Sequence, residues 1–210
     1  AEKTAIGKQL RSNWMPTQIN APLNTSFQSN GGFTSKLFGK KFGGTFGIMY
    51  NRSFRNLDLL NRANVIDENT YEVSIVSSYN DRKYQQEISA GALGSVSLQL
   101  NSFNKISVKS ILNINSSNSV SQRNGEDFSR QDQLKGSEFT FKQNTFFTVQ
   151  ANGEHRLIKP LTFKWYGAFN ILDGHIPDQR RILYSKEAGT QHPYRLLISN
   201  TLSQQSGSRI

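Results

Sequence analysis

The feature that most constrains the fold of this chain is an alternation of apolar and polar residues sustained over long segments. Between Ile88 and Leu100, apolar or small side chains occupy every even position, and most odd positions are polar. The segment 106–115 repeats the pattern, with breaks at Ser110 and Ile111. A period of two is that of a β-strand whose two faces meet different surroundings.

Further segments alternate in the same way, and the first strand, near residues 25–36, is weaker. The alternation predicts long antiparallel strands, paired with their neighbours in sequence, near Gly44 to Arg55, Ile88 to Leu100, Ile106 to Ser116, Glu138 to Ala151 and Leu161 to Ile171. The strong segments are about 11 to 14 residues long. Strands of soluble proteins run about five or six residues, whereas a tilted membrane strand needs about 9 to 11. The lengths favour an all-β, antiparallel transmembrane β-barrel; a large soluble β-sandwich is the alternative.

The composition agrees with a barrel without requiring one. Hydrophobic residues make up 35% of the chain, the mean hydropathy is −0.56, and Phe is the leading aromatic with 14 copies. Barrels are polar on average because only one face of each strand meets lipid. No apolar run reaches the roughly 18 residues of a transmembrane helix, and the absence of cysteine excludes disulfides and thiolate metal sites.

The connections between the expected strands alternate in length. Short connections are expected at Gly39 to Gly43, Asn101 to Lys105 and Asn152 to Pro160, and long ones at Asn56 to Gln85, Ser116 to Ser137 and Leu172 to Pro193. Outer-membrane barrels have short periplasmic turns and longer extracellular loops. The alternating stretch Tyr71 to Tyr79 is then β-structure within an extracellular loop or a strand extending above the membrane. About six spanning strands result, the first running toward the periplasm.

This pattern divides the chain into three parts. Residues 1–23 are expected to be an extracellular loop or linker, 24–171 the strands with their turns and loops, and 172–210 an extracellular loop leading into the next strand. About six strands cannot close a barrel, which needs about eight. Unpaired strand edges would leave backbone groups unsatisfied in lipid. We therefore expect a piece of a larger barrel, completed by the same protein or by partner chains. Ala1 to Leu10 is no signal peptide, so either one was removed by processing or the chain starts within a longer protein.

Parity assigns the side chains to two faces. Residues expected to face lipid are Ile106, Val108, Leu112, Ile114, Phe163, Trp165 and Phe169, with Val108 and Phe163 near mid-membrane. Candidates for the lumen are Lys109, Asn113, Asn115, Lys142, Lys164 and Asn170. Few acids accompany the lysines, and a one-signed lining concentrates the opposite ion. A mildly anionic or polar neutral ligand is therefore favoured over a cation.

The net charge of +10 would also suit a nucleic-acid-binding protein, but the scattered distribution of the basic residues disfavours that function. The tight basic pairs, Lys40-Lys41 and Arg180-Arg181, do not lie on a helix that could present a stripe to nucleic acid. Solvated loops, a polar lumen and loop contact with lipopolysaccharide explain the charge instead.

No residues form a pattern typical of catalysis, a cofactor or a metal. The histidines His155, His175 and His192 lie far apart in sequence, and Glu126-Asp127 lacks a calcium-binding loop. No glycine-rich phosphate loop or nucleophile elbow is present. We therefore expect neither an enzyme nor a cofactor.

Several segments together resemble the early barrel of TonB-dependent receptors, most closely the Bacteroidota type with an N-terminal carboxypeptidase-regulatory-like domain. The segments are Asn13-Trp14, Ala21-Pro22-Leu23-Asn24-Thr25-Ser26-Phe27, Leu37-Phe38-Gly39-Lys40-Lys41-Phe42-Gly43-Gly44, Lys105-Ile106-Ser107-Val108-Lys109, Asn113-Ile114-Asn115-Ser116, Pro177-Asp178-Gln179-Arg180-Arg181 and Pro193-Tyr194.

The resemblance implies a bacterial outer-membrane location and a 22-stranded barrel around a plug domain, which imports a nutrient ligand with energy delivered through TonB. The chain shows no recognisable plug and no TonB box, and by resemblance it covers the barrel from the first extracellular loop to about the seventh strand. The implied partners are outer-membrane lipid and lipopolysaccharide, the rest of the barrel with its plug, TonB through that plug, and a surface lipoprotein. A structural or secretion-associated barrel without active transport remains the other membrane hypothesis.

Overall fold

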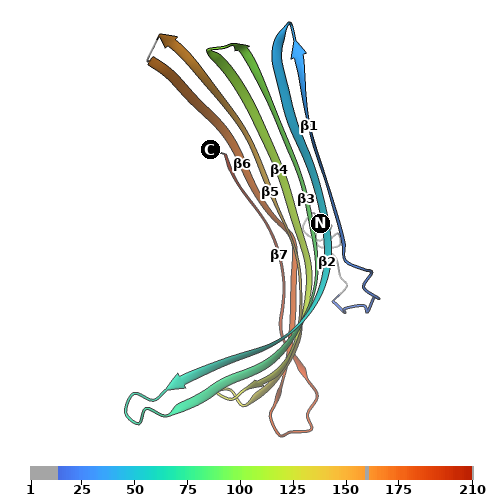
Figure 1. Ribbon diagram of the computed structural model, residues 1–210. Coiled ribbons are helices and arrows are strands. Elements are labelled where there is room, and N and C mark those ends of the chain that lie inside the picture. Colours follow the sequence, from blue (N-terminus) through green and yellow to red (C-terminus); the bar gives the residue numbers. More distant parts are fainter. Residues whose placement is uncertain (1–13, 159–160, 210) are drawn as a thin grey trace, which may run out of the picture.

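The computed structural model describes residues 14–158 and 161–209, which form one antiparallel sheet. Each strand pairs with its neighbours in sequence, so the order in the sheet is the order in the chain (Figure 1). The described residues contain no helix. The strands are β1 (Thr25–Leu37), β2 (Lys40–Ile66), β3 (Val73–Asn101), β4 (Asn104–Asp127), β5 (Asp132–Ile158), β6 (Leu161–Glu187) and β7 (Arg195–Arg209).

The sheet confirms the all-β, antiparallel fold class and the expected strand positions. Each of the five strong segments lies within one of the strands β2 to β6, and the weaker first segment is β1. All six neighbouring pairs are antiparallel. Residues 14–24 carry no regular secondary structure, and the first 13 residues of the expected linker lie outside the described part.

The short connections are tight turns at one end of the sheet, which we call the turn end. Phe38 and Gly39 link β1 to β2 with φ values of 51° and 73°. Positive φ at both central positions gives the turn the twist that antiparallel strands favour, at a steric cost for Phe38. Between β3 and β4, the side chain of Asn101 accepts a hydrogen bond from the backbone N–H of Phe103 at 2.8 Å. The turn between β5 and β6 falls at residues 159–160, outside the described part.

The prediction of long connections is wrong, because most of the residues assigned to them extend the strands. At the opposite end of the sheet, which we call the loop end, β2 continues to Ile66 and β3 begins at Val73. Tyr71 therefore lies in the turn between them, and the rest of the stretch expected as β-structure, up to Tyr79, belongs mostly to β3. Likewise β4 and β5 meet across residues 128–131, and β6 runs to Glu187 before β7 begins. Residues 172–209, the described part of the expected last loop, are therefore mostly strand. Polar residues on both faces erase the alternation there, while backbone pairing continues without it.

The register fixes which side chains share a face, because paired residues of an antiparallel sheet point the same way. One register row on the first face, which we call the apolar face, contains Gly31, Phe46, Gly94, Ser110, Val149 and Phe169. The next row along the strands, on the opposite or polar face, contains Gly32, Thr45, Ser95, Lys109, Gln150 and Ala168.

The sheet is a single layer, curved along its length, as Figure 1 shows. Among the described residues, Leu134 is the one large hydrophobic side chain that is buried, at 5% exposure. No helix among these residues is long and apolar enough to cross a membrane. The apolar side chains of this sheet are therefore left uncovered instead of forming a core.

Candidate functional site

The apolar face carries an uncharged band near the turn end. Four successive register rows of this face contain no charged residue across β1 to β6. They are the rows that pass through Phe42, Gly44, Phe46 and Ile48 of β2. The next row, through Tyr50, contains one, Asp173. We call the five rows from Phe42 to Tyr50 the apolar band.

The height of the apolar band matches that of a membrane-spanning surface. From Phe42 to Tyr50 the chain takes eight steps, which at about 3.4 Å each cover about 27 Å along the strand. With the roughly 40° tilt of barrel strands, the height becomes about 21 Å, close to the apolar belt of about 25 Å on outer-membrane barrels.

Large side chains of the band stand uncovered. Phe46 is 55% exposed, Ile48 49% and Phe169 49%. Monomeric soluble proteins rarely leave a continuous apolar surface of this kind in water. Exposed apolar surfaces of this kind are typical of faces that a membrane or a partner covers.

The register divides the expected lipid-facing and lumen-facing residues between the two faces. Ile106, Val108, Leu112, Ile114, Phe163, Trp165 and Phe169 all lie on the apolar face. Lys109, Asn113, Asn115, Lys142, Lys164 and Asn170 all lie on the polar face.

Phe163 lies at a different distance from the middle of the apolar band than the sequence predicted. Phe163 pairs with His155, three register rows from the middle row of the apolar band, and not near its middle as predicted. Val108 pairs with Val96, one row from the middle. Parity along a strand gives the face of a side chain, but its depth depends on where the turn falls.

The candidate lumen lysines do not form one cluster. On β1 to β6, Lys109 is the one charged residue of the polar face between the row of Gly43 and the row of Asn51. Lys164 lies nearer the turn end and forms an ion pair of 3.5 Å with Glu154. Lys142 lies beyond the row of Asn51, toward the loop end. The polar face beside the apolar band is therefore close to neutral.

Hydroxyl and amide groups dominate this stretch of the polar face. Thr45 and Ser95 share a hydrogen bond of 2.7 Å, and Ser97 donates one of 2.9 Å to Ser107. An apolar cluster also lies here, in two adjacent rows, and the sequence indicated only one of its members, Ile111, as a break in the alternation. Its members are Met49, Leu93, Ile111, Phe146 and Leu172.

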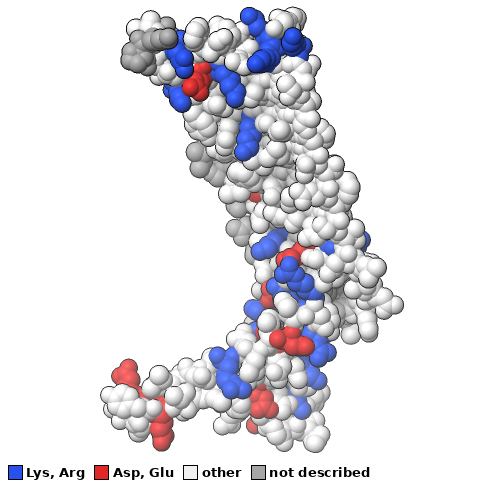
Figure 2. Space-filling model, in the orientation of Figure 1, with Lys and Arg blue, Asp and Glu red and all other residues white. Residues whose placement is uncertain are grey.

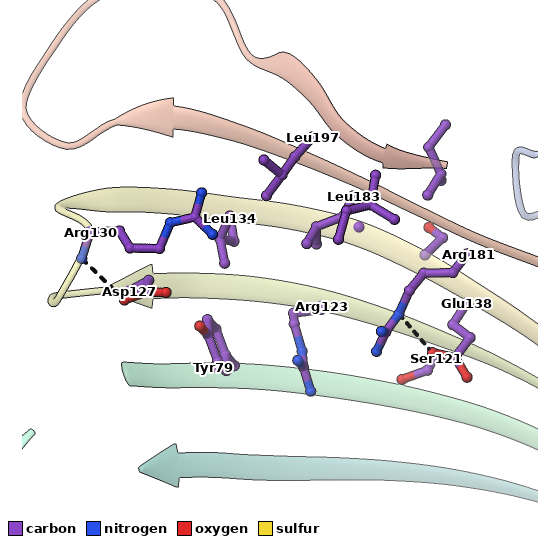
Figure 3. Close-up of a pocket in the computed structure, with 14 residues that line it drawn as sticks. Tyr79, Ser121, Arg123, Asp127, Arg130, Leu134, Glu138, Arg181, Leu183 and Leu197 are labelled. Atoms are coloured by element: carbon purple, nitrogen blue, oxygen red, sulfur yellow. Dashed lines mark hydrogen bonds and ion pairs between the residues drawn. The ribbon is translucent and has the colours of Figure 1, made fainter. Parts of the chain in front are cut away.

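A pocket of about 230 Å³ opens on the polar face at the loop end (Figure 3). Arg123 lines it and donates two hydrogen bonds to Asp81, at 2.8 and 2.6 Å, while its guanidinium lies 4.6 Å from the centre of the Tyr79 ring. Arg181 pairs with Glu138 at 3.0 Å across the neighbouring strands. The pocket combines polar donors with apolar walls, but its cations are already paired with carboxylates.

The charged residues gather toward the two ends of the sheet. Figure 2 shows Lys and Arg at both ends of the visible face, with a largely uncharged region between them. At the loop end, six arginines form ion pairs: Arg55, Arg82, Arg123, Arg130, Arg180 and Arg181. Four of these arginines, Arg55, Arg82, Arg123 and Arg181, pair with an acid on a neighbouring strand, so the sequence alone does not reveal their partners.

Metal-ligating residues do not converge in the described part of the chain, where no group of three or more His, Asp or Glu could hold an ion. His155 instead accepts a hydrogen bond of 3.0 Å from Trp165 Nε1 and is 2.8 Å from the side-chain oxygen of Asn104.

No protein-family model matches the sequence, and no curated protein matches it.

Proposed function

We propose that this chain is part of a TonB-dependent outer-membrane receptor that imports a nutrient ligand across the bacterial outer membrane. The observation that carries the proposal is the apolar band: five register rows of membrane height across six strands, with Asp173 as their one charged residue, backed by a polar face. The sequence resemblance supplies the receptor family.

Two further features support a barrel wall. Strands β1 and β7 each have one unpaired edge in the described sheet. In lipid such edges need partners, because no water is available for their N–H and C=O groups. Further strands of the full-length protein would satisfy them and close the barrel, with the polar face toward the lumen.

In this arrangement the apolar band meets outer-membrane lipid, and the paired arginines of the loop end lie near lipopolysaccharide. The plug fills the lumen and connects the barrel to TonB, and a surface lipoprotein covers the loop end. The strands cross the membrane, and the lumen wall of this chain contributes to the ligand path without catalysis.

Site-directed spin labelling of the full-length protein in lipid vesicles tests the membrane assignment. Single cysteines at Val108 and Leu112 should give labels relaxed by oxygen, which concentrates in hydrocarbon. The adjacent polar-face positions Lys109 and Asn113 should give labels relaxed by a water-soluble nickel chelate. A soluble β-sandwich would show the same accessibility without vesicles, and that result would exclude the membrane assignment.

Growth of cells on the imported ligand tests the transport assignment. Uptake through this receptor should stop when TonB is deleted, while the protein remains in the outer membrane. A structural or secretion-associated barrel predicts that TonB deletion leaves its activity unchanged. Unchanged uptake would therefore exclude active transport and leave the barrel assignment standing.

Ligand selection by the lumen depends on Lys109, the one charge of the polar face beside the apolar band. Changing both Lys109 and Lys164 to Glu should weaken uptake of an anionic or polar neutral ligand. Lys164→Glu alone is the control, because Lys164 lies outside these rows and is paired with Glu154. If cells with the double change match wild-type uptake at equal expression, the lumen does not select the ligand by charge.

A further inference from the structure

A row of lysines crosses the polar face at the turn end. Starting at β1 and ending at β6, one register row contains Lys36, Lys41, Gln99, Lys105, Glu154 and Lys164. We call these residues the lysine row. Its four lysines and one glutamate share a face, so five of its six side chains bring charge to one line across the sheet.

Three of the lysines form no ion pair within the described residues, although Glu154 is the register neighbour of Lys105 as well as of Lys164. Within the described residues, Lys164 is paired with Glu154, but no ion pair joins Lys36, Lys41 or Lys105 to an acid. The six paired arginines of the loop end provide the contrast. The fold therefore pairs six arginines with acids at one end and, in the described part of the chain, leaves three lysines of one row without an ion pair at the other.

The position of Lys36 and Lys41 costs stability. These two residues are directly opposite each other in the register. Like charges facing each other across strands, with Cβ atoms about 5 Å apart, are destabilising. An anionic group between the two ammonium groups would remove this repulsion.

The turn next to this pair is also unusual. Phe38 is 93% exposed and adopts a φ of 51°, which is strained for an aromatic residue. Its ring stands uncovered within two residues of Lys36 and three of Lys41. A partner that reaches the lysine row could cover this ring as well.

We propose that the lysine row is a docking surface for an extended acidic polypeptide segment. From β1 to β6 the row crosses five interstrand spacings of about 4.8 Å, or about 24 Å. An extended segment of about seven residues covers that length. Carboxylates on alternate residues would lie on one side of it and face the ammonium groups.

The side of the sheet selects a polypeptide over lipid. The lysine row lies on the polar face, whereas the proposed lipid contact is the apolar band on the opposite face. Anionic lipid headgroups would therefore meet the wrong side of the strands. The choice of a polypeptide over lipid rests on the proposed function, whereas the lysine row itself does not.

Fluorescence anisotropy tests the proposal with the full-length protein in a neutral detergent. The probe is a fluorescein-labelled peptide of seven residues with Glu and Ser alternating, and its control has Gln in place of Glu. Wild-type protein should bind the Glu peptide and not the Gln peptide. Binding should weaken as salt rises, because exposed charges are screened.

The main variant replaces Lys36, Lys41 and Lys105 by Gln and should weaken binding about tenfold at about 0.1 M salt, from three exposed charge contacts. Replacing the same three lysines by Arg should preserve binding, which shows that the fold is intact. The matched control replaces three cations away from the turn end, Arg62, Lys83 and Lys135, by Gln, and should change affinity less than twofold.

Three results would overturn the proposal: no binding of the Glu peptide, equal losses in the Gln variant and the matched control, or displacement of the peptide by dihexanoyl phosphatidylglycerol at lower concentrations than by unlabelled peptide. The last would identify a lipid site. Failure of TonB-dependent uptake would refute the proposed function without changing any of these binding results.

Discussion

An arginine placed in the apolar band should destabilise the membrane-inserted protein according to its depth. Leu112 lies two residues from Ser110, which is in the middle row of the band. Two residues at about 3.4 Å and a tilt near 40° place Leu112 about 5 Å from the midplane. Arginine on the lipid face costs about 2 to 4 kcal/mol at the midplane and about 0 to 1 near the interfaces. We therefore expect Leu112→Arg to cost about 2 to 3 kcal/mol.

The neighbouring residue and a second depth provide the controls. Asn113 lies at the same depth on the opposite face, so Asn113→Arg should cost less than about 1 kcal/mol. Phe163 is six residues from the middle row at Phe169, about 15 Å from the midplane, so Phe163→Arg should also cost less than about 1 kcal/mol.

Denaturant titration of the full-length protein in phospholipid vesicles, followed by tryptophan fluorescence, measures these free energies. The order of the losses in unfolding free energy among the three variants tests separately which face each residue lies on and how deep it lies. Equal losses for Leu112→Arg and Asn113→Arg would refute the assignment of faces. A loss at Phe163 as large as that at Leu112 would refute the position of the midplane.

Two other perturbations test local features of the sheet. A Cβ at Gly153 would overlap the Trp165 ring, so Gly153→Ala should cost about 1 to 3 kcal/mol of unfolding free energy and shift the tryptophan emission, whereas Gly167→Ala, with nothing within 4 Å, should change neither. In the turn between β2 and β3, hydrogen bonds from the backbone N–H groups of two following residues lower the pKa of Asp67. A lowered pKa means that this contribution is present above the ordinary pKa of the carboxyl and is lost as the pH falls through the folded value. Amide exchange in that turn should therefore speed up in acid for wild type, and should not change with pH in this way for Asp67→Asn once intrinsic exchange is subtracted.

Alternation revealed the strands where the two faces of the sheet differ, and failed where they do not. Beside the apolar band, every second residue is apolar or small, so β3 from Ile88 to Leu100 was evident from sequence. Beyond the band, β4 continues to Asp127 through residues that are mostly polar on both faces. A strand held by backbone pairing alone leaves no period in its side chains. The expected long loops were an error of this origin.

The faces of the candidate residues followed from parity, but their partners did not. Lys164 was expected as a lumen charge, and its pairing with Glu154 depends on the register between β5 and β6. Arg123 and Asp81 are 42 residues apart in sequence and meet only because β4 pairs with β3 as far as Asp127. Interactions between strands need the register, and the register depends on where each turn begins.

The unequal extension of the strands beyond the apolar band gives the sheet a direction. On the turn side, β2 begins two residues before Phe42, whereas on the loop side it continues from Tyr50 to Ile66. Sixteen residues at about 3.4 Å each give a path of about 54 Å along the curved strand beyond the band, whereas the two residues on the turn side give only about 7 Å. A bilayer centred on the band therefore leaves the turn end within its headgroups and lets the loop end stand clear of the membrane. Outer-membrane barrels keep their short side in the periplasm, so in the proposed receptor this asymmetry would orient the lysine row toward the periplasm. The pocket lined by Arg123 and Arg181 would then face the cell exterior. A ligand entering from outside would meet the paired arginines first and Lys109 later.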